Sequence, residues 1–358
     1  MEDREKTMTL VNETLERGLE RVRGLESRGT RAALKAAVAL NRRFPDQLQA
    51  QIELARLLWE GGHADLGARY ARSVSRRRDL SARAKGLLLT LEGKCLLELE
   101  QDSRAATTLR RAVALDSPMA PTLLGVALCR KGQYGAAGRV LSQAWRKDPG
   151  NDEPLYNLGV CQLLGGRPRR AASTFVRVLE LVPEHAEAAA HLAWCRLLVR
   201  PRDEQEISAL LLRARERDPV SGWPLLYRAL ADAWFAAGRS PLAPLAQLAK
   251  RWPDSNLPNI MRFVFHLRRG NRQRAPLVLR ALHSARRTSA EVRDLIAACD
   301  HAWPSNPARA GTASAQPPSR EGDSRRDGKL PAAVWQRLRG LILLEQQRSP
   351  VGAGRRWL

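Results

Sequence analysis

Small and apolar residues recur at a fixed interval in the middle of the chain, between residues 118 and 185. The first copy of the pattern contains Leu124-Gly125, Gly132, Ala137, Leu141 and Pro149, and the second contains Leu158-Gly159, Gly166, Ala171, Phe175 and Pro183. Every counterpart lies 34 residues further along the chain. A constant displacement of this kind indicates a structural repeat, which decides the fold before any single helix is assigned.

The residue types at these positions predict two helices in each copy. Small residues such as Gly125 and Ala137 suit the places where two helices cross closely, because a larger side chain would force the backbones apart. Gly132 suits the left-handed residue that ends a first helix, and Pro149 stops the second helix. Each helix pair can bury its apolar side only against its neighbours, so we expect an all-α stack of pairs.

This pattern resembles the tetratricopeptide repeat, in which Leu-Gly lies in the first helix, Ala and Phe lie in the second, and Pro follows. Weaker copies extend the resemblance upstream to Leu54-Ala55 and downstream to Gly270. They give about eight helix-turn-helix units between residues 12 and 290. The resemblance implies a right-handed superhelical solenoid whose concave surface is lined by the first helices.

The pattern divides the chain into four predicted parts. Residues 1–46 form a helical pair that serves as a degenerate repeat or a cap, and residues 47–302 form the solenoid. Residues 303–330 are rich in Pro, Ser, Gly and charge without apolar periodicity, which is typical of a flexible linker. Residues 331–358 contain a short amphipathic helix and a basic tail. This helix could cap the solenoid, dock on another protein or a membrane surface, or occupy the chain's own groove.

In this family the groove is lined by set positions of each first helix. Read onto this chain, those positions are largely apolar: Trp59, Leu97, Met119, Val126, Tyr156, Val160, Leu163, Trp194, Leu197 and Phe235. Tyr156, Trp194 and Phe235 are the expected hot spots for a client peptide. An apolar stripe also has a structural interpretation, because a tightly wound superhelix buries part of that face against the next turn of helices. Charge is sparse at these positions, with Arg56, Lys94, Arg130 and Glu153 among the few examples.

Composition adds a strong positive charge. The 358 residues include 60 Lys and Arg against 37 Asp and Glu, a net charge of +23 at pH 7. Acidic proteins, nucleic acid and anionic membrane surfaces are the partners that such a charge favours. Because only 5% of the residues are aromatic and no recognition motif is present, the sequence does not favour nucleic acid.

No motif for catalysis, a cofactor or a metal is found. The 5 cysteines form no C-x-x-C pair, and the 6 histidines are scattered. We expect Cys95, Cys161 and Cys195 to be buried. Cys129 lies nearer the groove, where a reactive thiol is an alternative that the sequence does not favour. Because no catalytic motif is present, we expect a non-enzymatic protein. Because no apolar signal segment opens the chain and no stretch is long enough to span a membrane, we expect it to be cytoplasmic.

The sequence therefore predicts a protein–protein interaction scaffold, adaptor or chaperone that captures a client peptide in its apolar groove. By analogy with other repeats of this kind, the process would be assembly of a bacterial secretion or surface complex. The alternative is a solenoid whose arginine-rich convex side binds nucleic acid or an anionic membrane. Self-association is left open, and peripheral membrane contact would involve the C-terminal helix.

Overall fold

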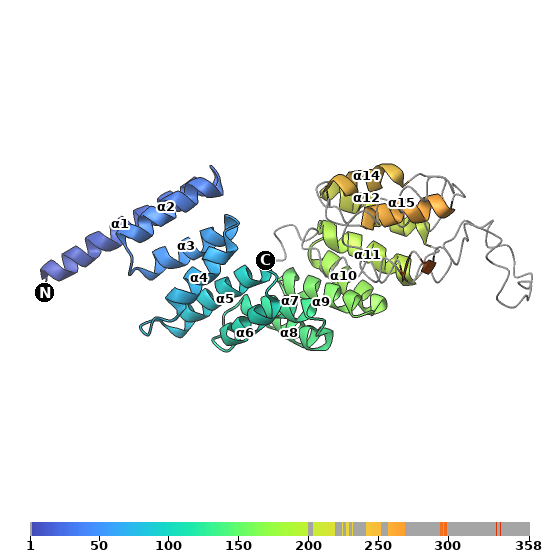
Figure 1. The fold of residues 1–358 in the computed structure, drawn as a ribbon. Helices are drawn as coiled ribbons and strands as arrows, with labels where there is room; N and C mark the ends of the chain where they lie inside the picture. Colours follow the sequence, from blue (N-terminus) through green and yellow to red (C-terminus); the bar gives the residue numbers. More distant parts are fainter. Residues whose placement is uncertain are drawn as a thin grey trace, which may run out of the picture. The chain divides into compact units, whose positions relative to one another are not determined.

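The computed structural model describes residues 2–199, 203–218, 241–251 and 257–268, together with isolated positions between 224 and 337. Every regular element in these ranges is an α-helix (Figure 1). The chain divides into two compact units, residues 1–161 and residues 162–357, and the boundary between them falls inside one helix. The all-α fold class is confirmed.

Eight helices and the first part of a ninth belong to unit 1. They are α1 (Glu2–Glu26), α2 (Thr30–Arg43), α3 (Leu48–Glu60), α4 (Ala64–Ser75), α5 (Ala82–Glu98), α6 (Asp102–Val113), α7 (Ala120–Arg130), α8 (Tyr134–Lys147) and α9 (Asp152–Leu164). Unit 2 contains α10 (Pro168–Leu181), α11 (Ala186–Val199), α12 (Glu204–Arg217), α14 (Leu242–Arg251) and α15 (Leu257–Arg268).

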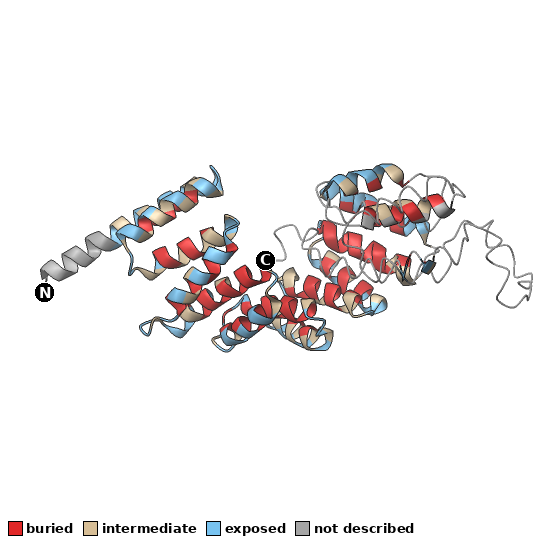
Figure 2. Cartoon of the chain, viewed as in Figure 1, coloured by how far each residue is buried: buried red, intermediate tan, exposed pale blue. Residues whose placement is uncertain are grey.

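Consecutive helices pack against each other within each unit. In unit 1 the contacts run without interruption from α1 to α8, and the first helices α3, α5 and α7 also contact one another. In unit 2, α11 lies between α10 and α12. The first helices α5, α7 and α11 are buried along most of their length (Figure 2). This sequential stacking is the arrangement that the repeat predicts.

Glycines stand where the helices of a pair cross. A Cβ atom added to Gly125 on α7 would lie 2.4 Å from Cγ of Leu141 on α8, and one added to Gly93 on α5 would lie 2.5 Å from Cγ of Leu109 on α6. Gly132 has a φ of 73°, so it ends the first helix in the left-handed region. The structure thus confirms both roles that the sequence assigns to the repeat glycines.

A cluster of aromatic rings forms part of the core of unit 2. The Trp194 ring stacks on the Tyr227 ring with their centroids 5.3 Å apart and an interplanar angle of 3°. Nδ1 of His191 lies 3.0 Å from the Tyr227 hydroxyl oxygen. All three side chains are at least 96% buried, with exposures of 4% for His191, 0% for Trp194 and 1% for Tyr227.

Several predicted segments lie outside the described residues. They are the repeat at Gly270, the linker 303–330, and residues 331–358 apart from Val334 and Arg337. The helices α1 and α2 occupy the range predicted for the N-terminal pair.

We expect Gly125→Ala to destabilise unit 1 by about 1–3 kcal/mol, because Leu141 is fully buried and cannot move aside. The matched control is Gly135→Ala on α8, where the nearest atom to an added Cβ is Nη1 of Arg139 at 4.0 Å. This control should be neutral or stabilise by up to about 1 kcal/mol. Urea unfolding of the two variants would contradict the packing account if both changed stability equally.

Candidate functional site

Seven of the ten predicted groove residues are buried in the structure. They are Leu97, Val126, Tyr156, Val160, Leu163, Trp194 and Leu197, and none of them is more than 5% exposed. Of the others, Trp59 is half-buried and Met119 is 43% exposed, while Phe235 lies outside the described residues. The expectation that Tyr156 and Trp194 are open anchors is therefore wrong for this structure, and their role in client binding stays a prediction.

These predicted groove residues are buried because of the position of the first helices in the stack. A first helix has neighbours on several sides, so residues on nearly all of its faces are covered, as on α11, where Ala186 to Cys195 are all buried. Trp194 fills the core beside Tyr227, and truncating a residue of this size in a core opens a cavity. Its burial is what the structural interpretation of the apolar stripe predicts.

An accessible surface remains on the first helices of unit 1, and we call it the first-helix face. Trp59 on α3 lies at one end of this face. Nε1 of Trp59 donates a hydrogen bond of 3.2 Å to Oε2 of Glu98 on α5, and Nζ of Lys94 lies 4.6 Å from the centroid of the Trp59 ring. This cation–π contact holds the indole between a lysine and a carboxylate.

Burial sets the electrostatics of this face. Lys94 is only 8% exposed, and burial lowers the pKa of its ammonium group, although Glu153 and Glu60 oppose this effect. Burial likewise raises the pKa of Glu153, while Lys94 acts in the opposite direction. Lys94 and Glu153 are therefore a partly desolvated pair of opposite charges, and Lys94 lies over the Trp59 ring.

Other charges on this face brace the helices. Nη1 of Arg130 donates to the carbonyl oxygen of Leu97 at 3.0 Å, and its Nε lies 3.1 Å from Oδ1 of Asp102. Hydrogen bonding to Glu53 is the main cause that raises the pKa of Arg56, which also pairs with Glu26 and Glu60. Both guanidinium groups are engaged within unit 1, so they hold the surface in shape.

Two large apolar side chains are exposed at the other end of the same helices. Leu87 on α5 is 37% exposed, and Met119 at the N-cap of α7 is 43% exposed. Both occupy the second position of their repeats, and α5 contacts α7 directly. The first-helix face thus combines an apolar end with an aromatic and charged end. Sequence reasoning also reads Leu87 onto a groove position, as the second residue of its repeat, but it does not name Glu98, which the repeat position could have identified.

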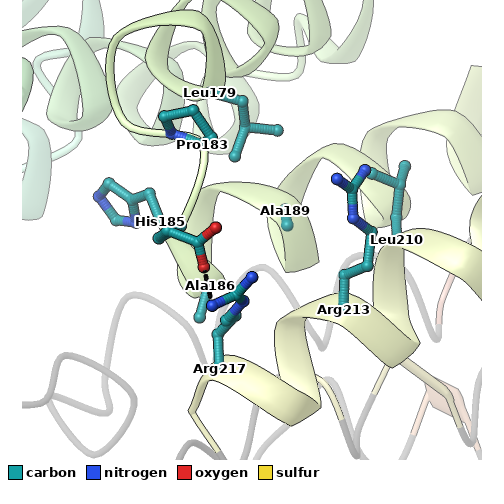
Figure 3. Close-up of a pocket in the computed structure, with 9 residues that line it drawn as sticks. Leu179, Pro183, His185, Ala186, Ala189, Leu210, Arg213 and Arg217 are labelled. Carbon is teal, nitrogen blue, oxygen red and sulfur yellow. Dashed lines mark ion pairs between the residues drawn. The ribbon is translucent and has the colours of Figure 1, made fainter.

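Unit 2 contains a small pocket between the end of α10, the start of α11 and the last turns of α12 (Figure 3). Its volume is about 130 Å³. The lining is apolar on one side and charged at the rim, and consists of Leu179, Pro183, Glu184, His185, Ala186, Ala189, Leu210, Arg213 and Arg217. His185 also caps α11, since its Nδ1 accepts a hydrogen bond of 3.3 Å from the backbone N–H of Ala188.

A larger, basic cleft of about 640 Å³ lies between α10 and α11. Arg169, Ser173 and Arg177 line it from α10, and Arg196 lines it from α11. Nε of Arg196 lies 3.2 Å from Oε1 of Glu206, so this wall already holds one carboxylate. The arrangement can accept an anionic group.

Comparison with known proteins identifies a repeat family for one part of the chain. Residues 128–195 match the sequence profile of the tetratricopeptide repeat. The match shows this repeat in that part of the chain. No curated protein sequence matches the chain. The profile covers part of α7 through part of α11, which includes the second of the two copies recognised in the sequence.

Several solved structures are similar to parts of the chain. YrrB, described as a protein with an unusual peptide-binding site, is 17% identical, with 55% of this chain and 98% of YrrB covered and a TM-score of 0.40. MamA is 20% identical, with 46% and 95% covered and a TM-score of 0.40. The C-terminal part of a repeat protein from Cytophaga hutchinsonii is 19% identical, with 64% and 94% covered and a TM-score of 0.44.

The four cysteines that the structure describes are buried. Cys95, Cys161 and Cys195 are at most 1% exposed, as the sequence predicts. Cys129 is 3% exposed, and a hydrogen bond with Cys161 together with burial raises the pKa of its thiol. The interpretation of Cys129 as a reactive thiol is therefore wrong for this structure, because the thiolate is disfavoured. Cys299 lies outside the described residues.

Two further kinds of site are absent from the described part of the chain. No group of three or more His, Cys, Asp or Glu residues there could hold a metal ion. Among the helices that the structure describes, none is both long enough and apolar enough to span a membrane.

The buried His191 predicts a pH-dependent stability of unit 2. Burial lowers the pKa of His191 to about 3, with His185 adding to the effect, from an ordinary value of 6.5. The unfolded chain binds this proton at a higher pH than the folded chain, so the stabilising contribution is full above pH 6.5 and falls as the pH falls toward 3. Between pH 7 and pH 4.5 we expect a loss of about 2–3 kcal/mol.

Thermal unfolding between pH 4.5 and pH 7 measures this effect. His191→Gln should flatten the pH dependence relative to the parent chain, whereas His63→Gln, which alters an exposed histidine, should not. An unchanged pH dependence in His191→Gln would show that other groups control the acid sensitivity.

Proposed function

We propose that this protein is a non-enzymatic tetratricopeptide repeat scaffold that holds a segment of a client protein against the first-helix face of unit 1. The observation that carries the proposal is the exposure of Leu87 and Met119 at one repeat position on two helices in contact. Exposed apolar side chains on neighbouring helices suit anchors for a partner, since burying them removes apolar area from water.

The charged end of the face supports a specific rather than a purely adhesive contact. Trp59 is held by Lys94 and Glu98, so the indole is positioned before a partner arrives. Tryptophan in a preorganised setting is typical of interaction hot spots, because little side-chain entropy remains to be lost on binding. Lys94 and Glu153, already partly desolvated, lose less hydration than fully solvated charges would.

The basic cleft between α10 and α11 supports a second candidate function. Its three arginines, Arg169, Arg177 and Arg196, suit contact with the phosphates of nucleic acid or of an anionic membrane surface. Salt separates the two candidates, because phosphate contacts weaken steeply as the salt concentration rises, whereas contacts between apolar anchors do not. We therefore expect client capture to be similar at 50 and 300 mM NaCl, roughly the range over which phosphate binding collapses.

The double variant Leu87→Ser with Met119→Ser tests the proposed client site. Removing both anchors should weaken client binding by about 2–4 kcal/mol, without unfolding the chain, because both side chains are exposed. The measurement is a comparison of the proteins that co-purify with the full chain and with the variant from the native host, quantified by mass spectrometry.

The matched control is Leu66→Ser with Leu212→Ser. These leucines are 52% and 54% exposed and lie on the second helices α4 and α12. A client lost only from the Leu87 and Met119 variant supports the site. Equal recovery of clients by both double variants, or equal loss from both, would place the binding surface elsewhere.

The process that the client serves stays a prediction. An adaptor or chaperone role in a bacterial secretion or surface complex, and a cytoplasmic location, are favoured only by analogy with other repeats. The same holds for self-association and for membrane contact through residues 331–358.

A further inference from the structure

The small pocket of unit 2 has the dimensions of a site for one apolar side chain. Its volume of about 130 Å³ is close to that of apolar cavities of about 150 Å³ that accept benzene. The apolar wall is made by Leu179, Ala189 and Leu210, which come from three successive helices. An aliphatic residue or a phenyl ring of a partner would replace water against this wall.

The rim of the pocket carries two guanidinium groups from one helix. Arg213 and Arg217 are one turn apart on α12; Arg217 extends toward the start of α11, and Arg213 extends alongside Leu210 (Figure 3). Arg217 forms an ion pair with the carboxylate of Glu184, which precedes α11. Within the described structure, no carboxylate pairs with Arg213.

The Glu184 ion pair shows which chemistry this rim accepts. A carboxylate at the end of a flexible side chain reaches the guanidinium of Arg217, and Arg213 offers the same group one turn earlier, beside the apolar wall. Both side chains of the existing pair are more than half exposed, 58% for Arg217 and 55% for Glu184. The pair therefore contributes little to the stability of the fold, and another carboxylate can replace that of Glu184.

We propose that this pocket binds a protein segment in which an aliphatic or phenyl side chain is followed closely by Asp or Glu. The apolar side chain fills the pocket, and the carboxylate pairs with Arg213. This site is separate from the first-helix face and would give the scaffold a second point of attachment in unit 2. Two weak sites joined by one chain raise the overall affinity through effective concentration.

A segment with a side-chain carboxylate is favoured over a polyanion by the geometry of the pocket. The apolar lining is aliphatic, and the one aromatic ring among the lining residues, that of His185, is only 7% exposed, so it offers little surface on which a base could stack. A partner segment with one apolar side chain and one carboxylate matches this pocket, in which Arg213 lies beside a single apolar cavity.

Selection from a phage-displayed library of random dodecapeptides against the full chain tests this inference. We expect the enriched peptides to share an aliphatic or phenyl residue with Asp or Glu within about three positions. A representative peptide, made synthetically with blocked ends, should bind about tenfold more weakly to Arg213→Gln, and Ala189→Phe should fill the pocket and abolish binding. Fluorescence anisotropy of the labelled peptide provides the affinities.

The matched control for the charge is Arg215→Gln, which alters an exposed arginine of α12 outside the pocket. It should leave the affinity unchanged, as should the double variant Leu87→Ser with Met119→Ser, which tests the first-helix face. If Ala189→Phe fails to fold by circular dichroism, replacing the peptide's own apolar residue by Ala and its acidic residue by Gln serves the same purpose.

Three results would overturn the inference. One is a failure to enrich any peptide, and another is a set of enriched peptides without the acidic residue. The third is a peptide that loses equal affinity with Arg213→Gln and Arg215→Gln, because that pattern reflects the general positive field of α12 rather than this pocket.

Discussion

The close crossing of two helices within each repeat is the constraint on which the rest of the structure depends. At Gly93 and Gly125 the partner helix brings a leucine within 2.5 Å of where a Cβ would stand, so only glycine permits the approach. This approach lets Leu109 and Leu141 become fully buried, and it fixes the distance at which the next pair can stack. Each pair then completes its core only through its neighbours.

The same stacking decides how much surface remains for a partner. A first helix that lies between neighbours loses most of its apolar stripe to the interior, as Trp194 does in unit 2. Where side chains stay accessible, on α3, α5 and α7, the surface is shaped by contacts between first helices, including the cation–π pair of Lys94 with Trp59. The binding capacity that we propose thus comes from what the stack leaves uncovered rather than from the whole groove.

The fold could be predicted from the sequence because its determinants are local. Gly132 and Gly166 end first helices in the left-handed region, and α8 and α10 end just before Pro149 and Pro183. The site could be predicted only in part, since the register places both Trp59 and Trp194 at groove positions but does not say how tightly the helices pack around each. The pocket of unit 2 was not predicted, because it needs residues from three helices and the Pro183 loop.

The central claim is that a client rests on the first-helix face of unit 1. Site-specific photocrosslinking in the native host tests it most directly, with benzoylphenylalanine placed singly at Leu87, Met119, Leu66 or Leu212 of the full chain. The account predicts a crosslinked client from positions 87 and 119 and none from positions 66 and 212. A client crosslinked from position 66 or 212, with none from 87 or 119, would contradict it.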